Sequence, residues 1–219
     1  MANTVAFIHT SASMLPVFKP LAEKLLPGVS TFHVVDESLL CDLLREGRVP
    51  PGTARRVANQ VVSANDAGAT HIVVTCSSMG PAVEASRAFV PAKVMRVDEA
   101  MVDAALDVGP RVGVVATLPS TLAPTAALVR STAAKRGINA TVDALLVAGA
   151  FTAVMSGDGA THDRLVAEAV AKLSADHDVV LLAQASMARA VDAMTPEQKP
   201  KPVLASPKLA VARLAQLLK

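Results

Sequence analysis

Two short segments of this sequence have similar residues but place different reactive side chains at the same point. Residues 72–79 read IVVTCSSM and residues 180–187 read VLLAQASM, so an offset of 108 aligns Cys76 with Gln184. Each segment is an apolar run that ends in small polar residues, a pattern typical of a buried parallel strand that leads into a loop. A thiol can exchange protons or attack as a nucleophile, whereas an amide only forms hydrogen bonds. One half of the chain therefore offers a thiol where the other offers an amide.

The similarity between the two halves extends beyond these segments. At an offset of 107 or 108, further identical pairs are Val5 and Val112, Thr10 and Thr117, Ser13 and Ser120, Thr53 and Thr161, and Arg56 and Arg164. A nearly constant offset over most of a half indicates a duplicated structural unit. Two such units can close face to face, so we expect Cys76 and Gln184 to lie on opposite sides of one ligand.

Small polar residues gather where the expected strands end. Ligands of parallel sheets bind outside the carboxyl ends of the strands. Hydroxyl and amide groups there suit a carboxylate or the oxyanion of an enolate, because orphan amides and helix dipoles favour negative charge. The candidate ligand-binding residues are Thr10, Ser11, Ser77, Ser78, Thr117, Ser120, Thr121, Gln184, Ala185 and Ser186. Helix capping is the alternative role of the serines and threonines, and Asp36 and Glu37 could either line this edge or open a helix.

Three residues are candidate acid–base groups: Cys76, His9 and His162. Cys76 precedes an expected helix, whose dipole and free amides favour a thiolate. His9 ends the first expected strand and His162 lies near a helix start, and imidazole exchanges protons near neutral pH. The alternative is structural in each case, with the thiol as a small buried apolar group and each histidine as part of the fold.

The remaining cysteine and two further histidines have no expected role in chemistry. Cys41 is predicted on the core face of a helix, and His71 and His177, which precede strands, are predicted to be solvated. No pair of residues has the spacing of zinc ligands, and no glycine-rich phosphate loop follows a strand. We therefore expect neither a metal nor a cofactor.

The elements that position these residues alternate along the chain. Strands are expected at residues 5–8, 31–35, 72–75, 94–97, 112–116, 141–146, 179–182 and 203–205, and helices near 17–26, 38–46, 53–65, 81–89, 122–135, 160–173, 187–193 and 207–218. This alternation predicts an α/β fold of two pseudo-symmetric lobes, each a mainly parallel sheet wrapped by helices. The first lobe comprises residues 1–97 plus 206–219 and carries Cys76, and the second comprises 98–205 and carries Gln184. The last helix has no counterpart in the first half.

Composition limits the classes of function. The 219 residues, of which 52% are hydrophobic and 18% charged, suffice to bury a core. A formal net charge of +2 and the absence of Trp and Tyr argue against nucleic-acid binding. No apolar stretch approaches the roughly 18 residues of a membrane helix, and the start does not resemble a signal peptide. Two distant cysteines favour a reducing compartment, so we expect a cytoplasmic protein with a small-molecule partner and leave homo-oligomer formation open.

The order of these motifs resembles the aspartate/glutamate racemase superfamily, which includes amino-acid and hydantoin racemases, maleate isomerases and arylmalonate decarboxylases. The resemblance spans the chain and rests on segments 8–11 (IHTS), 35–40 (VDESLL), 75–78 (TCSS), 114–117 (VVAT) and 182–187 (LAQASM). It implies two cysteines, one in each lobe, that act as acid and base on opposite faces of the substrate carbon. Cys76 matches the first of these, whereas Gln184 occupies the position of the second. The decarboxylases carry their single cysteine in the other lobe.

The resemblance implies a cofactor-independent isomerase, racemase-like or epimerase-like, with Cys76 as general acid or base. Its substrate would be a small amino acid or related acid that reacts at the carbon next to a carboxylate. Two alternatives within the superfamily are a single-cysteine decarboxylase that reprotonates one face and a cis–trans isomerase that uses Cys76 as a nucleophile. A third alternative, from another class, is a non-catalytic protein that binds a carboxylic acid. The sequence does not identify the substrate.

Overall fold

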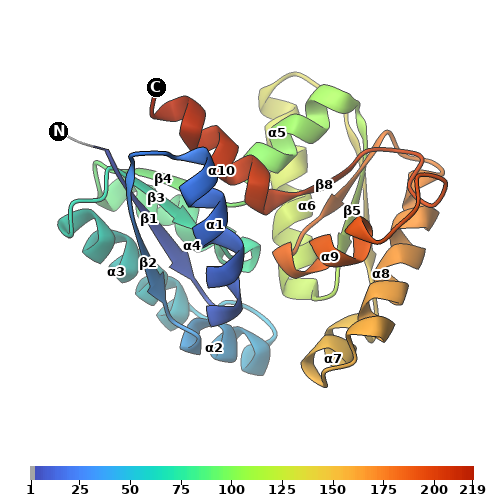
Figure 1. The fold of residues 1–219 in the computed structure, drawn as a ribbon, viewed down its shortest axis with the longest axis horizontal. Coiled ribbons are helices and arrows are strands. Elements are labelled where there is room, and N and C mark those ends of the chain that lie inside the picture. Colours follow the sequence, from blue (N-terminus) through green and yellow to red (C-terminus); the bar gives the residue numbers. More distant parts are fainter. Residues whose placement is uncertain (1–2) are drawn as a thin grey trace. The chain divides into compact units, whose positions relative to one another are not determined.

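The computed structural model describes residues 3–219, apart from the side chain of Asp192, and contains two compact units. Unit 1 comprises Met1–Val97 and Pro207–Lys219, and unit 2 comprises Asp98–Ser206. Each unit holds one four-stranded sheet with helices on both of its faces (Figure 1).

The two sheets have the same topology. In unit 1 the strand order is β2-β1-β3-β4, formed by β1 (Thr4–His9), β2 (Ser30–Val35), β3 (His71–Val74) and β4 (Lys93–Arg96). In unit 2 it is β6-β5-β7-β8, formed by β5 (Arg111–Ala116), β6 (Thr141–Leu146), β7 (Val179–Leu182) and β8 (Val203–Ala205). All neighbouring strands are parallel, and Val5 and Val112 occupy equivalent places in their sheets. The predicted α/β fold of two similar lobes is confirmed, with every predicted strand present.

Alternating side chains of the unit 1 strands build an apolar core on each face of the sheet. Ala6 and Ile8 pack beneath α2 (Ser38–Glu46), α3 (Pro51–Asp66) and α4 (Gly80–Ser86). Val5 and Phe7 point the other way and pack beneath α1 (Leu15–Leu25) and α10 (Ser206–Leu217). Three short 3₁₀ helices, η1 (Ala12–Met14), η2 (Ser77–Met79) and η3 (Arg87–Phe89), complete the unit.

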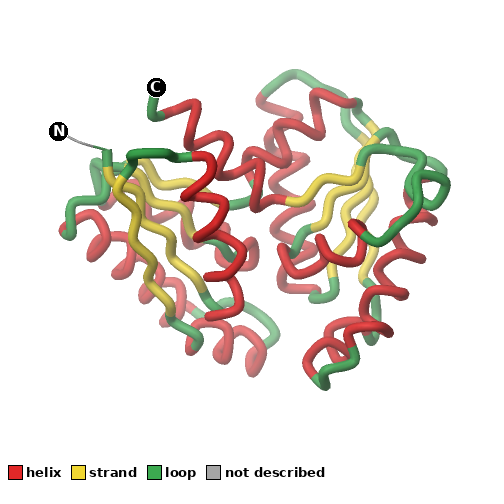
Figure 2. The backbone as a smooth tube through the Cα atoms, in the orientation of Figure 1, coloured by secondary structure: helices red, strands yellow, loops and turns green. Residues whose placement is uncertain are grey.

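Unit 2 repeats this layered arrangement (Figure 2). Val115, Val180 and Leu182 pack against α8 (Gly159–Ser174) and α9 (Ala188–Asp192). On the other face lie α5 (Glu99–Val108) and α6 (Pro119–Lys135), which contact strands of the sheet. The short helices α7 (Ala150–Met155) and η4 (Ala185–Met187) lie in the connections after β6 and β7. None of the described helices is long and apolar enough to cross a membrane.

Two helices, α5 and α7, were not predicted, and α5 corrects one expectation about the duplication. Helix α5 follows β4 and packs in unit 2, whereas α10 follows β8 and packs in unit 1. Their starts, Glu99 and Ser206, are 107 positions apart, so α10 does have a counterpart. The sequences of the two helices coincide at that offset only at Ala105 and Ala212. Each helix packs in a different unit, and their sequences do not reveal that they occupy equivalent places.

Candidate functional site

Cys76 lies at the carboxyl edge of the unit 1 sheet. Strand β3 ends at Val74, and Cys76 keeps an extended backbone (φ −110°, ψ 111°) before η2 begins. The backbone carbonyl of Cys76 accepts a hydrogen bond from Met79 N at 3.1 Å, which tightens the turn. Cys76 is half-buried, whereas Ser77 and Ser78 behind it are buried. The thiol is therefore held on a fixed backbone at a position that a small ligand can reach.

A buried arginine lies beside this turn, and the sequence analysis had not singled it out. Arg96 is 3% exposed, pairs in register with Val74 in the sheet, and donates from Nη1 to Glu84 Oε1 at 2.6 Å. A Cβ atom on residue 80 would lie 2.3 Å from Arg96 Cζ, so the guanidinium packs directly against Gly80 at the start of α4 and a larger residue there would displace it. The sequence feature that could have identified Arg96 is its charge within the apolar run predicted as a strand at residues 94–97. Arg96 is thus ion-paired with Glu84 inside unit 1 and braces the turn that holds Cys76.

His9 has both ring nitrogens engaged within unit 1. Its Nδ1 lies 2.8 Å from Thr75 Oγ1 and its Nε2 lies 2.9 Å from His33 Nδ1. The two imidazole planes are within 10° of each other, and the His9 ring also contacts Phe18. Burial, followed by the neighbouring His33, lowers the pKa of His9 to about 4. His9 is therefore a neutral, fully buried ring that already has two partners.

We expect the free energy of unfolding to decrease by about 2 kcal/mol between about pH 7 and pH 4 because of His9. The unfolded chain binds a proton on this ring at a pKa of 6.5, whereas the folded chain does so only at about 4. This contribution to stability is complete above the unfolded pKa, declines as the pH falls and ends below the folded pKa. Urea denaturation across this range should show the slope, and His9→Gln should flatten it. His71→Gln, which alters a half-buried ring at the start of β3, should retain most of it, and equal flattening in both variants would contradict the assignment.

Polar residues after β1 and β2 chiefly organise the loops of unit 1. Ser11 caps η1 by accepting from Ser13 N, and Glu37 Oε1 accepts from Ala12 N at 3.0 Å. Asp36 accepts from Arg56 Nη2 at 2.8 Å and from the backbone amide of Ser38. Burial alone would raise the pKa of Asp36, but the hydrogen bonds from Ser38 and the charge of Arg56 lower it. Asp36 thus supports the first turn of α2 and Glu37 the start of η1, and Thr10 is buried after the end of β1.

Gln184 follows β7 and is fixed by Thr117, which follows the neighbouring strand β5. Its Oε1 accepts from Thr117 N at 2.6 Å and from Thr117 Oγ1 at 2.9 Å. A backbone N–H can only donate, so the oxygen of the amide is the atom at this contact. No group in the described part of the chain accepts from the amide NH₂, which leaves two N–H donors at the edge of the unit 2 sheet. Ala185, next to Gln184, is half-buried and Ser186 is exposed, whereas after Thr117 the residues Ser120 and Thr121 are half-buried and buried.

His162 lies in the first turn of α8, which follows α7 in the connection between β6 and β7 of unit 2. Its residue exposure is 1%, and its Nδ1 lies 2.8 Å from Asp163 Oδ1. Its Nε2 is buried and has no hydrogen-bond partner among the described residues. Of the two predicted histidines, His162 is thus the one whose ring keeps a nitrogen unengaged.

The structure corrects two expectations about residues outside the site. Cys41 is exposed rather than in the core. Leu39 and Leu43 form the buried face of α2, and Cys41, two residues from each, lies on the opposite face of the helix. His177 is buried rather than solvated. Its Nδ1 lies 2.8 Å from Leu173 O and its Nε2 lies 2.8 Å from Asp143 Oδ2. The ring fills space above Gly113, which has no side chain of its own.

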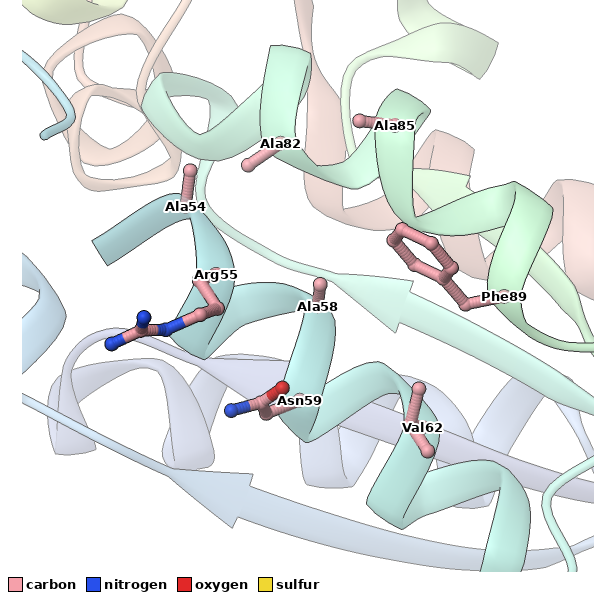
Figure 3. Close-up of a pocket in the computed structure, with 8 residues that line it drawn as sticks. All are labelled: Ala54, Arg55, Ala58, Asn59, Val62, Ala82, Ala85 and Phe89. Atoms are coloured by element: carbon pink, nitrogen blue, oxygen red, sulfur yellow. The ribbon is translucent and has the colours of Figure 1, made fainter. Parts of the chain in front are cut away.

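An apolar pocket of about 480 Å³ lies between α3 and α4 of unit 1. Figure 3 shows alanine side chains of the two helices facing each other, with the ring of Phe89 at one end. Arg55 is the only charged residue that lines it, and none of the predicted site residues does. The pocket therefore offers no acid–base chemistry. Within residues 3–219, no group of three or more His, Cys, Asp or Glu side chains could hold a metal ion.

Comparison with known proteins gives one family match and many shared folds. The family model for Asp/Glu/hydantoin racemases matches residues 6–214. No curated protein sequence matches the chain. Solved structures with the same fold include a Yersinia pestis protein assigned as an Asp/Glu racemase, at 16% identity and a TM-score of 0.77 over 99% of both chains. Allantoin racemase from Klebsiella pneumoniae has 19% identity and a TM-score of 0.69, covering 99% of this chain and 87% of its own. Glutamate racemase from Francisella tularensis, solved with D-glutamate, has 16% identity and a TM-score of 0.73, covering 99% of this chain and 81% of its own.

Proposed function

The chain belongs to the Asp/Glu/hydantoin racemase family and is a racemase-type isomerase, and we propose that it is a cofactor-independent racemase or epimerase of a small amino acid or related acid. The observation that carries this proposal is the position of Cys76. The thiol stands half-buried at a strand end of unit 1, where ligands of parallel sheets bind. The cysteine is also the residue that the resemblance assigns to proton transfer at carbon.

Cys76 would act as a thiolate that removes the proton from the carbon next to the carboxylate. The C–H bond breaks, the proton moves to sulfur, and the electron pair is delocalised into the carboxylate as an enolate. That negative charge needs donors and positive charge. In unit 1 the hydroxyl of Ser77, the residue after Cys76, is suited to this role. In unit 2 the NH₂ group of Gln184, with its oxygen already bound by Thr117, is suited to donate to a substrate oxygen.

Racemisation needs a second acid–base group that acts on the opposite face of the carbanion. Gln184 cannot take this role, because a neutral amide does not exchange a proton with carbon. His9 is a poor choice, because both of its ring nitrogens have partners and its pKa is lowered to about 4. We assign the second role to His162, whose Nε2 has no partner among the described residues.

The substrate class follows from this donor set. A thiolate and an amide donor suit a small anion with one acidic C–H bond. Fold relatives named for glutamate and for allantoin indicate that an amino acid and a cyclic ureide are the two chemistries to test first.

The test is deuterium exchange in heavy water. Single enantiomers of amino acids, hydantoins and substituted malonates are incubated with the protein, and deuterium on carbon and optical purity are followed together. We expect exchange and loss of optical purity for at least one amino acid. Release of carbon dioxide from a malonate would establish a decarboxylase instead. Binding of carboxylates without any exchange would establish a binding protein.

A further inference from the structure

His162 belongs to a chain of three side chains in unit 2. Its Nδ1 lies 2.8 Å from Asp163 Oδ1. Arg189, on α9, holds the same carboxylate from the other side, with Nη2 at 3.2 Å from Oδ1 and Nε at 3.1 Å from Oδ2. Neighbouring residues of a helix do not normally face each other, so the contact between His162 and Asp163 requires a particular orientation of both side chains.

The carboxylate of Asp163 sets the tautomer of the ring. Burial alone would raise the pKa of Asp163, but hydrogen bonds from His162 and Arg189 outweigh burial and lower it. An ionised carboxylate only accepts hydrogen bonds, so the proton of this contact must lie on Nδ1 of His162. In the neutral ring, Nε2 then carries a lone pair.

That lone pair has no partner in the described part of the chain. Nε2 of His162 is buried, and no donor reaches it. Buried polar atoms are almost always hydrogen-bonded, and an exception calls for a specific reason such as a catalytic role or an absent ligand. A nitrogen of fixed tautomer whose lone pair makes no hydrogen bond is the arrangement that a general base needs once a substrate reaches it.

Arg189 is itself held in place by the first turn of α8. A Cβ atom on residue 159 would lie 2.7 Å from Arg189 Nη2, so the guanidinium rests directly on Gly159. Gly159 and Asp163 are four residues apart and thus share one face of the helix. The Arg189 side chain is 65% exposed and that of Asp163 is 28% exposed, so the arginine covers the carboxylate from the solvent side.

We propose that Asp163 and Arg189 are positioning residues: Asp163 holds His162 as the Nδ1–H tautomer and Arg189 orients the Asp163 carboxylate, so that Nε2 can take a proton from the substrate carbon. This inference rests on the proposed function of His162. When Nε2 gains the proton, the C–H bond breaks, its electron pair stays on the substrate as the enolate, and the ring becomes an imidazolium. The positive charge of the imidazolium is then balanced by the Asp163 carboxylate, which still accepts the hydrogen bond from Nδ1–H. Racemisation is completed when the Cys76 thiol donates its proton to the opposite face of the carbanion and becomes the thiolate. In the reverse direction the imidazolium donates from Nε2 and returns to the neutral ring.

The tautomer can be measured without any substrate. Long-range ¹H–¹⁵N correlation spectra of ¹⁵N-labelled protein distinguish protonated from bare ring nitrogens, and His162→Gln identifies the signals of His162. We expect Nδ1 protonated and Nε2 bare in the unmodified protein. A ring protonated on Nε2 alone would overturn the proposal, and this measurement does not depend on the folding of a variant.

Asp163→Asn should reverse the tautomer. Arg189 donates hydrogen bonds and therefore attracts the carbonyl oxygen of the new amide, which turns the NH₂ group towards Nδ1 of His162. Nδ1 must then accept, and the proton moves to Nε2. Asp143→Asn is the matched control, because it alters the histidine–aspartate pair of His177 in the same unit. It should leave the signals of His162 unchanged.

Activity supplies the second readout. Asp163→Asn should lower kcat for racemisation by about 100-fold or more with little change in KM, because the wrong tautomer blocks proton transfer and not binding. Arg189→Gln should keep the tautomer and lower kcat by less than about tenfold, since its side chain is largely exposed. A reversed tautomer with unchanged kcat would overturn the proposal while leaving the racemase function intact. If the unmodified protein exchanges no substrate, the proposed function fails, and the spectra alone still decide whether Asp163 sets the tautomer.

Discussion

For the enantiomer whose C–H bond faces Cys76, replacing Cys76 with serine is expected to lower the rate of deuterium exchange at the substrate carbon by about 1,000-fold or more. General acid–base groups contribute about 10² to 10⁴ to such rates. A serine hydroxyl has nearly the same size as the thiol but does not ionise near neutral pH, so the variant should fold and bind yet fail to remove the proton. The measurement is the initial rate of deuterium incorporation, with the affinity for a substrate or product determined separately.

Cys41→Ser provides the matched control. Cys41 is exposed on α2, and exposed substitutions usually change the free energy of unfolding by less than about 0.5 kcal/mol. Its exchange rate should equal that of the unmodified protein. The role of Cys76 is wrong if Cys41→Ser is equally damaging, or if Cys76→Ser keeps its rate while circular dichroism shows both variants folded.

Replacing His162 with glutamine is expected to separate racemisation from exchange. Glutamine approximates the size and hydrogen bonding of the ring but cannot take a proton from carbon. Net racemisation should fall by about 10² to 10⁴-fold, the range of a lost general base. Exchange on the face served by Cys76 should persist with retention of configuration. Chiral chromatography and mass spectrometry of the same samples measure the two rates together.

Two further variants sharpen this prediction. His177→Gln removes the other buried histidine of unit 2, which lies outside the proposed site, and should leave the ratio of racemisation to exchange unchanged. Gln184→Cys, made in the His162→Gln background, introduces the second thiol of the resembled racemases and should restore part of the racemisation. If His162→Gln racemises at the full rate, another group serves the second face and the assignment of His162 fails.

The sequence alone determined the strands and their order. Apolar runs of four to six residues, separated by helical patterns, predicted all eight strands, because a strand buried on both faces needs continuous apolar sequence. The duplication predicted two sheets of the same topology. It also placed Cys76 and Gln184 at equivalent strand ends, since local pattern fixes where a strand stops.

Other features of the candidate site depend on residues that are distant in the sequence. His9 has a lowered pKa because it meets His33 and Thr75 in the folded core, 24 and 66 positions away. Gln184 is oriented by Thr117, 67 positions away, and no local pattern marks that pair. In the sequence, Arg96 is one charged residue in an apolar run. Only the folded structure shows that it is buried beside Gly80 at the edge of the unit 1 sheet.

Tertiary packing also decided which side of each helix is buried and which unit each helix joins. Cys41 was expected in the core but is exposed, because Leu39 and Leu43 already fill the buried face of α2. Helices α5 and α10 hold equivalent places in the duplication yet share almost no sequence, since each packs against a different sheet. The positions of strands and helices are encoded by local patterns of apolar and polar residues. Burial, side-chain partners and pKa are set by surroundings that exist only once distant segments have packed together.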